Sequence, residues 1–304
     1  MKTWIRISVL HVLTAGLLCA QTVVGRAEAT WSLREKLGSG ERLRIMSPNG
    51  AITITQGNGS EVDVRAEKRA ERDARIDDIG FIVKRVPNGL VVCAVYDDDD
   101  DCDMERGDRS RNRRSRDERR YRARASFTVR IPAGVLVDAF TGNGDVAING
   151  AGSTVDASTG NGRVQVTNTT GRVKATTGNG AVTVDGAKGE VEASTGNGDV
   201  RVTTSSGPVN ASSGNGDIEV SMDRVDRAEA MTFTTGSGRI VLSMPGDFGA
   251  ELESSTGNGS ISSDLPIRLA GRIDRHRMRG TLGRGGERLA LSTGNGDIEI
   301  RRTR

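Results

Sequence analysis

The chain has 304 residues, of which 35% are hydrophobic, only 3% are aromatic and 40 are glycine. A compact core usually takes much of its volume from aromatic side chains, so this interior must be filled by small aliphatic residues, as in repeat proteins. The formal net charge is +3, and residues 30–304 keep 40 basic and 39 acidic residues, a balance that argues against nucleic acid as a general partner.

Residues 1–29 have the organisation of a secretory signal. Lys2 and Arg6 precede a mostly apolar stretch from Ile7 to Ala20, and Ala27-Glu28-Ala29 supplies a small-x-small cleavage site. We therefore expect cleavage after Ala29 and export to the periplasm or to the cell surface and extracellular space. No later segment is apolar enough to cross a membrane, so we expect no span in the mature chain.

Residues 30–92 alternate between apolar and polar positions, with turns rich in Asn and Gly. Leu43 and Ile45, Ile52 and Ile54, and then Val62 follow this period of two. Such runs between Asn-Gly turns indicate strands. This region is expected to form the first coils, or the cap, of a larger β structure.

Residues 93–124 interrupt the pattern. Cys93 and Cys102 form an even pair after signal removal and predict one disulfide in an oxidising compartment, the alternative being two free thiols. The run Asp97–Asp101 lies between them. The following segment, 103–124, is rich in Arg and has almost no apolar residue, so we expect an exposed, disordered insertion.

Residues 125–304 contain a regular repeat. The first glycine of a Thr-Gly-Asn-Gly motif recurs every 18 residues, with looser copies later in the chain, at Gly142, Gly160, Gly178, Gly196, Gly214, Gly236, Gly257 and Gly294. Two short strands fit into each unit, so the fold class is predicted as all-β, a single β-solenoid of about nine stacked coils between Thr141 and Ile300. The last gap, of 37 residues, indicates roughly two coils with an irregular insertion at 268–288.

Period-two alternation also predicts which side chains face inward. Val200 and Val202 are expected inside the solenoid and Arg201 outside. Charges 18 residues apart should then pair on adjacent coils. The expected pairs are Arg172 with Glu190, Lys174 with Glu192, and Arg201 with Glu219.

These residues carry a resemblance to a known family. The segments 43–54 and 129–134, the Thr-Gly-Asn-Gly repeats and the closing stretch 280–296 resemble the bacterial putative-adhesin domain, a domain of unknown function. The likeness covers most of residues 40–304. It implies an exported β-solenoid and offers no catalytic residues; the Arg-rich insertion departs from the family pattern.

The corner asparagines have two interpretations. We expect Gly and Asn there because both accept positive φ, and we expect the stacked amides to hydrogen-bond as a structural ladder. An anion-binding row of backbone amides is the less favoured alternative. The ladder residues are Asn143, Asn161, Asn179, Asn197, Asn215, Asn258 and Asn295.

Metal sites and short recognition motifs are poorly supported. Asp145 follows its corner as in a calcium-binding β-roll, but Arg163 holds the same place one coil later, so no metal or other cofactor is expected. The run Asp97–Asp101 is a better cation candidate but lacks fixed ligand spacing. Arg106-Gly107-Asp108 arises easily by chance in such a segment.

Catalysis has equally little support. His276 is the one histidine after signal removal, which leaves no pattern for a nucleophilic triad. Asp199 and Asp217, on neighbouring coils, could act as paired carboxylates of a glycan-active enzyme, but aromatic platforms for sugars are nearly absent.

The sequence therefore predicts an exported, non-catalytic scaffold that presents polar strand faces to an unidentified envelope or surface protein or glycan. The alternative is a periplasmic sensing or ligand-binding module that uses residues 93–124. A glycan-active enzyme is the third possibility.

Overall fold

The computed structural model describes residues 23–71, 74–96, 102, 122–204, 206–225, 229–270 and 274–303. Within these ranges the chain consists of strands and one 3-10 helix, η1 (Ile76–Asp78), so the protein is all-β. The core of the predicted export signal, the run Asp97–Asp101 and most of the Arg-rich segment lie outside the described residues.

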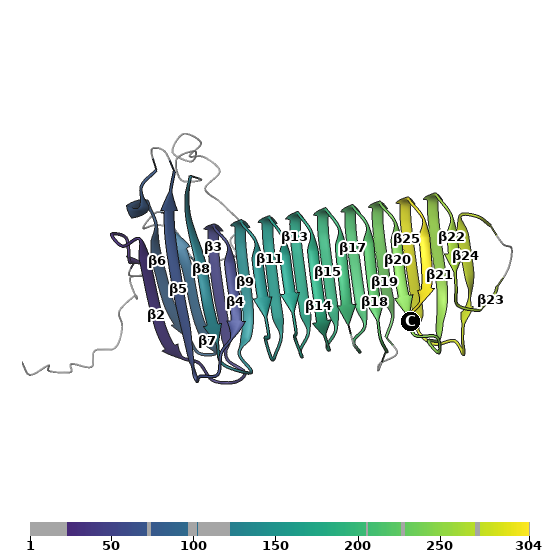
Figure 1. The fold of residues 1–304 in the computed structure, drawn as a ribbon, viewed down its shortest axis with the longest axis horizontal. Coiled ribbons are helices and arrows are strands. Elements are labelled where there is room, and N and C mark those ends of the chain that lie inside the picture. The colour runs from purple at the N-terminus through teal and green to yellow at the C-terminus, as the bar shows by residue number, and fades with distance from the viewer. Residues whose placement is uncertain are drawn as a thin grey trace, which may run out of the picture.

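Two long sheets lie face to face and form a column (Figure 1). The first sheet contains, in spatial order, β1 (Val23–Val24), β6 (Gly80–Val86), β7 (Gly89–Val95), β3 (Arg42–Asn49), β9 (Leu136–Asn143), β11 (Val155–Asn161), β13 (Val173–Asn179), β15 (Val191–Asn197), β17 (Val209–Asn215), β19 (Met231–Ser237), β25 (Arg288–Asn295), β21 (Ala250–Asn258), β24 (Arg277–Leu282) and β23 (Ile267–Leu269). The second contains β2 (Thr30–Lys36), β5 (Glu61–Ala70), β8 (Ala123–Ile131), β4 (Ile52–Gln56), β10 (Val146–Asn149), β12 (Val164–Thr167), β14 (Val182–Ala187), β16 (Val200–Thr204), β18 (Ile218–Met222), β20 (Ile240–Met244), β26 (Ile298–Arg302) and β22 (Ile261–Ser263).

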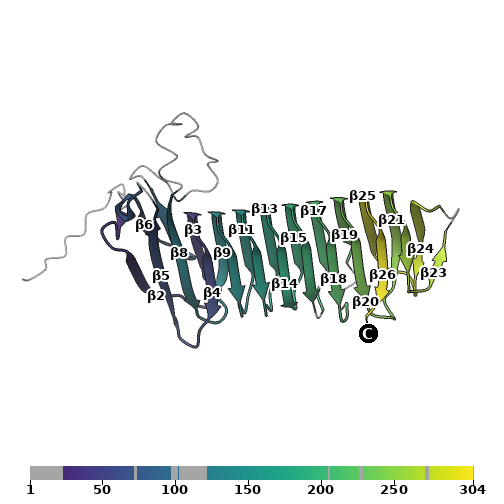
Figure 2. The ribbon, with the colours of Figure 1, turned by 45° about the horizontal axis from the view of Figure 1, so that its top comes forward.

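Each coil is one strand of the first sheet, a corner, and one strand of the second sheet. Successive coils pair in parallel, and in the regular part the register is the 18-residue repeat: Val155 lies opposite Val173, and Val182 opposite Val200. Equivalent positions of successive repeats therefore lie opposite one another along the column, and Figure 2 shows the strands stacked in this way. The predicted β-solenoid is confirmed.

The core is a narrow double layer of small side chains. Val200 is fully buried and Val202 is nearly so, while the Arg201 side chain between them is 55% exposed, which confirms the predicted alternation. Valine in one sheet faces valine and alanine in the other along the regular coils. A flat interior of this kind needs no aromatic residue to reach native packing density.

The corner residues explain why the coils repeat so strictly. Gly162 has φ of +149°, and a Cβ on it would lie 2.1 Å from the carbonyl oxygen of Gly144 on the preceding coil. The buried Thr159 hydroxyl donates to that same Gly144 oxygen at 2.8 Å. Thus glycine lets the two backbones approach, and threonine satisfies the carbonyl that the approach buries.

The expectation that the corner asparagines have positive φ is wrong. Asn168, outside the ladder, is the one non-glycine residue with positive φ in the described part of the chain. At the Thr-Gly-Asn-Gly corners it is the second glycine that takes this conformation, and a Cβ on the first would clash instead: at Gly160 it would lie 2.6 Å from the Gly142 oxygen. Asn is therefore placed there by its side chain and not by its backbone.

The coils are not stacked in chain order at the C-terminal end. After β21 and β22 the chain forms the antiparallel strands β23 and β24 and then returns to form β25 and β26. This last coil lies between the β19–β20 coil and the β21–β22 coil. From Leu136 onward the column has eight coils, where the sequence predicted about nine. The difference arises because much of the segment 268–288 does not form a coil but covers the edge of β21.

The N-terminal end uses the same arrangement. The β3–β4 coil lies between the β7–β8 coil and the β9–β10 coil. Beyond the β7–β8 coil, β6 closes the first sheet, with β1 of the expected signal segment paired to it, and β5 and β2 close the second, all by antiparallel pairing. Both ends of the column are therefore covered by segments that do not follow the repeat, as solenoids require.

The N-terminal cap contains most of the buried aromatic side chains and one buried lysine. Phe81 stacks on Trp31 at 4.8 Å between ring centroids and meets Phe127 edge-on at 5.7 Å. The Lys68 side chain is buried beside Phe81, and burial is the main reason that its pKa is lowered. Its Nζ donates at 2.6–3.1 Å to the carbonyl oxygens of Gly25, Arg26, Ile76 and Ile79.

The inward and outward positions of β16 can be tested by two charge substitutions. Val200→Asp buries a carboxylate without a partner in the narrow core between the two sheets. We expect the free energy of unfolding to fall by several kcal/mol. Arg201→Asp removes contacts with Asp199 and Glu219 on the solvent side, and we expect a loss of about 1 kcal/mol. Equal destabilisation of the two variants in thermal unfolding would contradict the register.

The buried threonine hydroxyl can be tested at one corner. Thr195→Val keeps the shape but leaves the Gly180 carbonyl oxygen without its 2.9 Å donor, so we expect a loss of about 1–3 kcal/mol. Thr195→Ser keeps the hydroxyl, as Ser213 does naturally one coil later, and should cost less. Thr183→Val, on the outer face, is the matched control and should be almost neutral in chemical denaturation.

Candidate interaction surface

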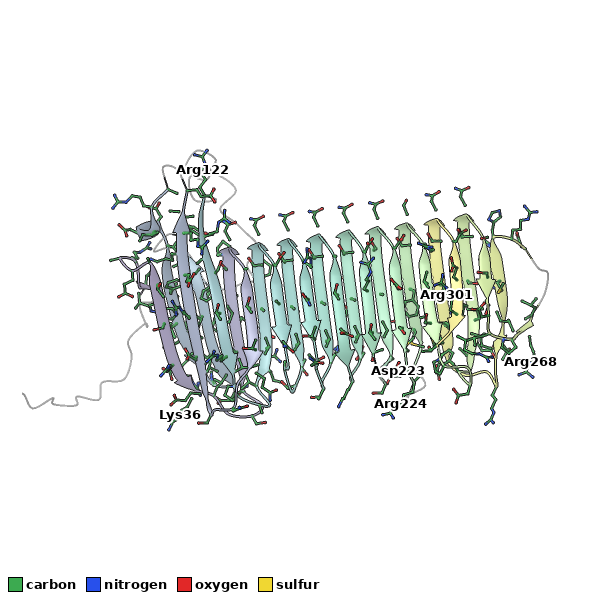
Figure 3. All side chains as sticks on the ribbon, in the orientation of Figure 1. Lys36, Arg122, Asp223, Arg224, Arg268 and Arg301 are labelled. Carbon is green, nitrogen blue, oxygen red and sulfur yellow. A yellow bond between two sulfur atoms is a disulfide. The ribbon has the colours of Figure 1, made fainter. Side chains whose placement is uncertain are left out.

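The corner asparagines form a hydrogen-bonded row along one edge of the column. From Asn143 to Asn215 each Nδ2 donates to the Oδ1 of the preceding asparagine at 2.7–2.9 Å. Figure 3 shows evenly spaced side chains along this edge. The row is interrupted at Ser237, where Asn295 donates to Oγ at 3.5 Å, and it ends with Asn258 donating to Asn295 at 2.8 Å.

The row begins with two residues that the sequence analysis did not include. Asn143 donates to Asn49 Oδ1 at 2.7 Å, and Asn49 donates to the Tyr96 hydroxyl at 3.3 Å. Tyr96 in turn donates to the Ala123 carbonyl at 2.7 Å. The Pro-Asn-Gly turn at 48–50 was the available signal for Asn49, but Tyr96 had none, because its coil carries no Gly-Asn-Gly corner.

The outer face of the first sheet carries a column of hydroxyl groups. The register places seven serine and threonine residues opposite one another on successive coils, and we call this set the hydroxyl column. Ser194 donates to Thr176 at 3.3 Å and Ser255 to Ser292 at 3.4 Å. In spatial order the members are Ser158, Thr176, Ser194, Ser212, Thr234, Ser292 and Ser255.

A second column on the same face, which we call the charged stripe, carries charges of both signs. In spatial order its members are Arg44, Asp138, Asp156, Lys174 and Glu192. Arg42 and Arg44 both pair with Asp138, the second at 3.3 Å. Further along, Lys174 pairs with Glu192 at 3.3 Å. These contacts form a stripe beside the hydroxyl column, and opposite charges on adjacent strands stabilise the stack modestly.

The three predicted charge pairs are confirmed. The Arg172–Glu190 pair is 3.4 Å apart, the Lys174–Glu192 pair 3.3 Å and the Arg201–Glu219 pair 3.5 Å. All six side chains are substantially exposed, so each pair contributes little on its own. At these three positions the pairing also keeps like charges from lying opposite one another on adjacent coils.

One carboxylate in the charged stripe lies between a like charge and an opposite charge. Asp156 lies between Asp138 and Lys174 in the pairing register. Its pKa is raised, first because the sheet partly desolvates the carboxylate and second because Asp138 is a negative neighbour. The stripe is thus most acidic near β9 and β11.

The N-terminal end of this face is apolar and carries the disulfide. Cys93 and Cys102 are joined, with their Cα atoms 6.1 Å apart. Both are buried in a small cluster separate from the main core, which we call the outer cluster. Its buried members are Met46, Ile82, Cys93, Val95 and Cys102.

The carboxylates considered for catalysis are used in backbone contacts. Asp199 Oδ1 accepts the Asp217 N–H at 3.1 Å, and its Oδ2 is 3.4 Å from Arg201. Asp217 Oδ1 accepts the Arg239 N–H at 2.8 Å. His276 is exposed, with its backbone N–H bonded to Asp274. The two aspartates therefore link successive coils, and neither forms a hydrogen bond or ion pair with His276 within the described part of the chain.

The described part of the chain contains neither a metal-binding cluster nor a membrane-spanning helix. No group of three or more His, Cys, Asp or Glu side chains in this part of the chain could hold a metal ion. None of its helices is long and apolar enough to span a bilayer.

Comparison with solved structures finds distant likenesses. A putative cell adhesion protein from Clostridium sporogenes is 9% identical with a TM-score of 0.28, covering 90% of this chain and 100% of that one. Putative adhesins from Bacteroides fragilis (13%, TM-score 0.39) and Parabacteroides distasonis (10%, TM-score 0.42) each cover 89% of this chain and 96% of their own.

Among curated proteins there is no significant match to this sequence. A family model described as Toastrack DUF4097 matches residues 103–301, which is well over half of the chain. The stacked coils, their repeated corners and this match agree, and the chain belongs to the Toastrack family.

Proposed function

We propose that the protein is an exported, non-catalytic scaffold whose first-sheet outer face binds another component of the cell envelope or surface. The observation that carries the proposal is the hydroxyl column, which runs in register beside the charged stripe. Side chains of this kind contribute little to folding, since they lie outside the core. A face that keeps hydrogen-bonding groups on seven successive coils is suited to contact with an extended partner.

The spacing of the column indicates what sort of partner fits. Adjacent coils of a parallel sheet lie about 4.8 Å apart, so donors and acceptors recur along the column at that interval. A repeating polar chain, such as a surface glycan or an extended protein segment, can meet several of them at once. Small side chains also leave the face flat, which allows close approach along its whole length.

Site-specific photo-crosslinking distinguishes the two outer faces. A crosslinking residue at Ser194 reports on the hydroxyl column, and one at Thr183 reports on the second sheet, both positions being half-buried on neighbouring coils. On cells we expect a discrete adduct from position 194 and none from position 183, read by gel shift and mass spectrometry. Adducts from position 183 alone, or from neither position, would contradict the proposal.

The purified adduct partner then allows a direct binding measurement. Replacing Thr176, Ser194 and Ser212 by Ala removes three adjacent hydroxyls. We expect the dissociation constant to rise at least about tenfold, because each lost hydrogen bond has a net contribution of about 0.5–1.5 kcal/mol. The matched control replaces Thr183 and Thr203 on the second sheet. Unchanged affinity in the first variant would exclude the column as the binding element.

A second candidate function uses residues 93–124 as a sensing or ligand-binding element. The outer cluster favours it, because the disulfide fixes Cys102 to Cys93, and the register places Cys93 in line with the end of the hydroxyl column, beside the charged stripe. A ligand held there would lie close to Asp138 and Phe140. Replacing residues 97–121 by a short Gly-Ser linker separates the candidates: retained crosslinking at position 194 favours the sheet face, and its loss favours the segment.

The disulfide itself should stabilise only the N-terminal end. Its two cysteines are 9 residues apart, so the chain-entropy model gives at most about 3 kcal/mol. In the double variant Cys93→Ala and Cys102→Ala we expect faster hydrogen exchange in β6 and β7 and unchanged exchange from β11 to β18. Exchange that rises equally along the column would show that the bond supports the whole stack.

A further inference from the structure

The Asn-Gly corners have a chemical liability that the stacking controls. In an Asn-Gly pair the glycine nitrogen can attack the asparagine side-chain carbonyl, since glycine has no side chain to obstruct the approach and is conformationally permissive. The sequence contains eleven such pairs, so this chemistry bears on every part of the column. The structure separates the pairs by what the glycine N–H contacts.

Eight of these glycine N–H groups donate to a backbone carbonyl of the next coil. At the Gly-Asn-Gly corners the acceptor is the carbonyl of the residue aligned on the next coil: Gly162 N–H donates to Asn179 O at 2.9 Å, and Gly296 N–H to Asn258 O at 2.8 Å. A nitrogen held in this way must lose its hydrogen bond before it can attack. The eight glycines are Gly50, Gly144, Gly150, Gly162, Gly180, Gly198, Gly216 and Gly296.

Two pairs differ. Asn258-Gly259 lies on the outermost coil, beyond which no further corner stacks, and within the described ranges the Gly259 N–H has no acceptor. Asn58-Gly59 lies in the exposed loop between β4 and β5, where the Gly59 N–H likewise has no acceptor among the described residues. The remaining pair, Asn88-Gly89, forms the β6–β7 hairpin, where Gly89 is already part of β7 and is paired with Val86.

We propose that Asn258 and Asn58 are the sites of spontaneous deamidation in the folded protein, and that stacking protects the eight corner pairs. At the first site a bond forms between Gly259 N and Asn258 Cγ, the Cγ–Nδ2 bond breaks, and ammonia leaves with the proton from Gly259 N. Water then opens the cyclic imide at either carbonyl. The product is an aspartyl or isoaspartyl residue at position 258.

The product at position 258 alters the end of the asparagine row. Asn258 Nδ2 donates to Asn295 Oδ1 at 2.8 Å, and deamidation replaces this donor by a carboxylate oxygen. The new charge faces an acceptor and also lies on the coil whose Ser260 is bonded to Asp297. Deamidation therefore loosens the outermost coil and leaves the inner coils unchanged.

Peptide mapping by mass spectrometry of the full-length protein, aged in mildly alkaline buffer, tests the proposal. Asn258 and Asn295 share the sequence Thr-Gly-Asn-Gly, so their rates compare two corners of identical local sequence that differ in the glycine N–H contact and in the side-chain partners of the asparagine. We expect Asn258 to convert roughly fivefold to tenfold faster than Asn295, the factor that the net contribution of one hydrogen bond corresponds to. Asn58, which is outside the row, should convert at least as fast.

Two controls keep the outcome decisive. Aged in denaturant, the chain should convert all its Asn-Gly pairs at similar rates, because the contacts are lost. In native protein Gly59→Ala should slow conversion at Asn58 without disturbing the fold, since the added Cβ meets only Glu61 N at 3.9 Å. Equal native rates at Asn258, Asn295 and Asn161, or native rates as high as those in denaturant, would overturn the proposal.

Discussion

The whole column depends on how closely one coil approaches the next at its corner. A Cβ on Gly198 would lie 2.1 Å from the Gly180 oxygen, so this contact exists only because the residue has no side chain. The same oxygen accepts the hydroxyl of Thr195, which is buried under the corner. One carbonyl thus fixes two of the four residues of the motif, and the requirement returns at every coil.

From that constraint the rest of the composition follows. The repeat length is constant from β9 to β18. The corner contact persists between Gly238 and Gly216, where the spacing is 22 residues, so the corner is kept even where the repeat lengthens. The stacked coils leave a narrow interior that Val and Ala mainly fill in the regular part. Most of the buried aromatic side chains, such as Trp31 and Phe127, lie at the N-terminal end, whereas Phe233 is buried inside the column on β19.

The sequence predicted the structural features that recur on many coils, but not the features that occur at a single place in the column. Period-two alternation placed Val200 and Arg201 correctly, and the 18-residue spacing identified the charge pairs, because both signals recur on many coils. The hydroxyl column follows from the same register but carried no chemical signal of its own. Alternation through β5 also puts Lys68 on the inward face, yet a charged residue does not reveal that four carbonyls surround it.

The order of the coils could not be obtained from the repeat at all. Corners at Gly257 and Gly294 carry the same Thr-Gly-Asn-Gly motif, so the motif does not indicate which of them stacks on β19. The antiparallel strands β23 and β24 decide the matter, since they cover the outer edge of β21. Their sequence, rich in Arg with few apolar residues, gives no strong period by which to recognise a strand.

The placement of β25 and β26 determines how the molecule can grow and be attached. Because the last coil is inside the stack, the chain leaves the column from its flank, one coil short of the end, as the C-terminal label in Figure 1 shows. A domain or tether fused after Arg302 would therefore project sideways and leave the tip free. Lengthening by duplication of an 18-residue unit is compatible with both caps only between β9 and β18, so evolution or design can vary the reach of the column without altering either end.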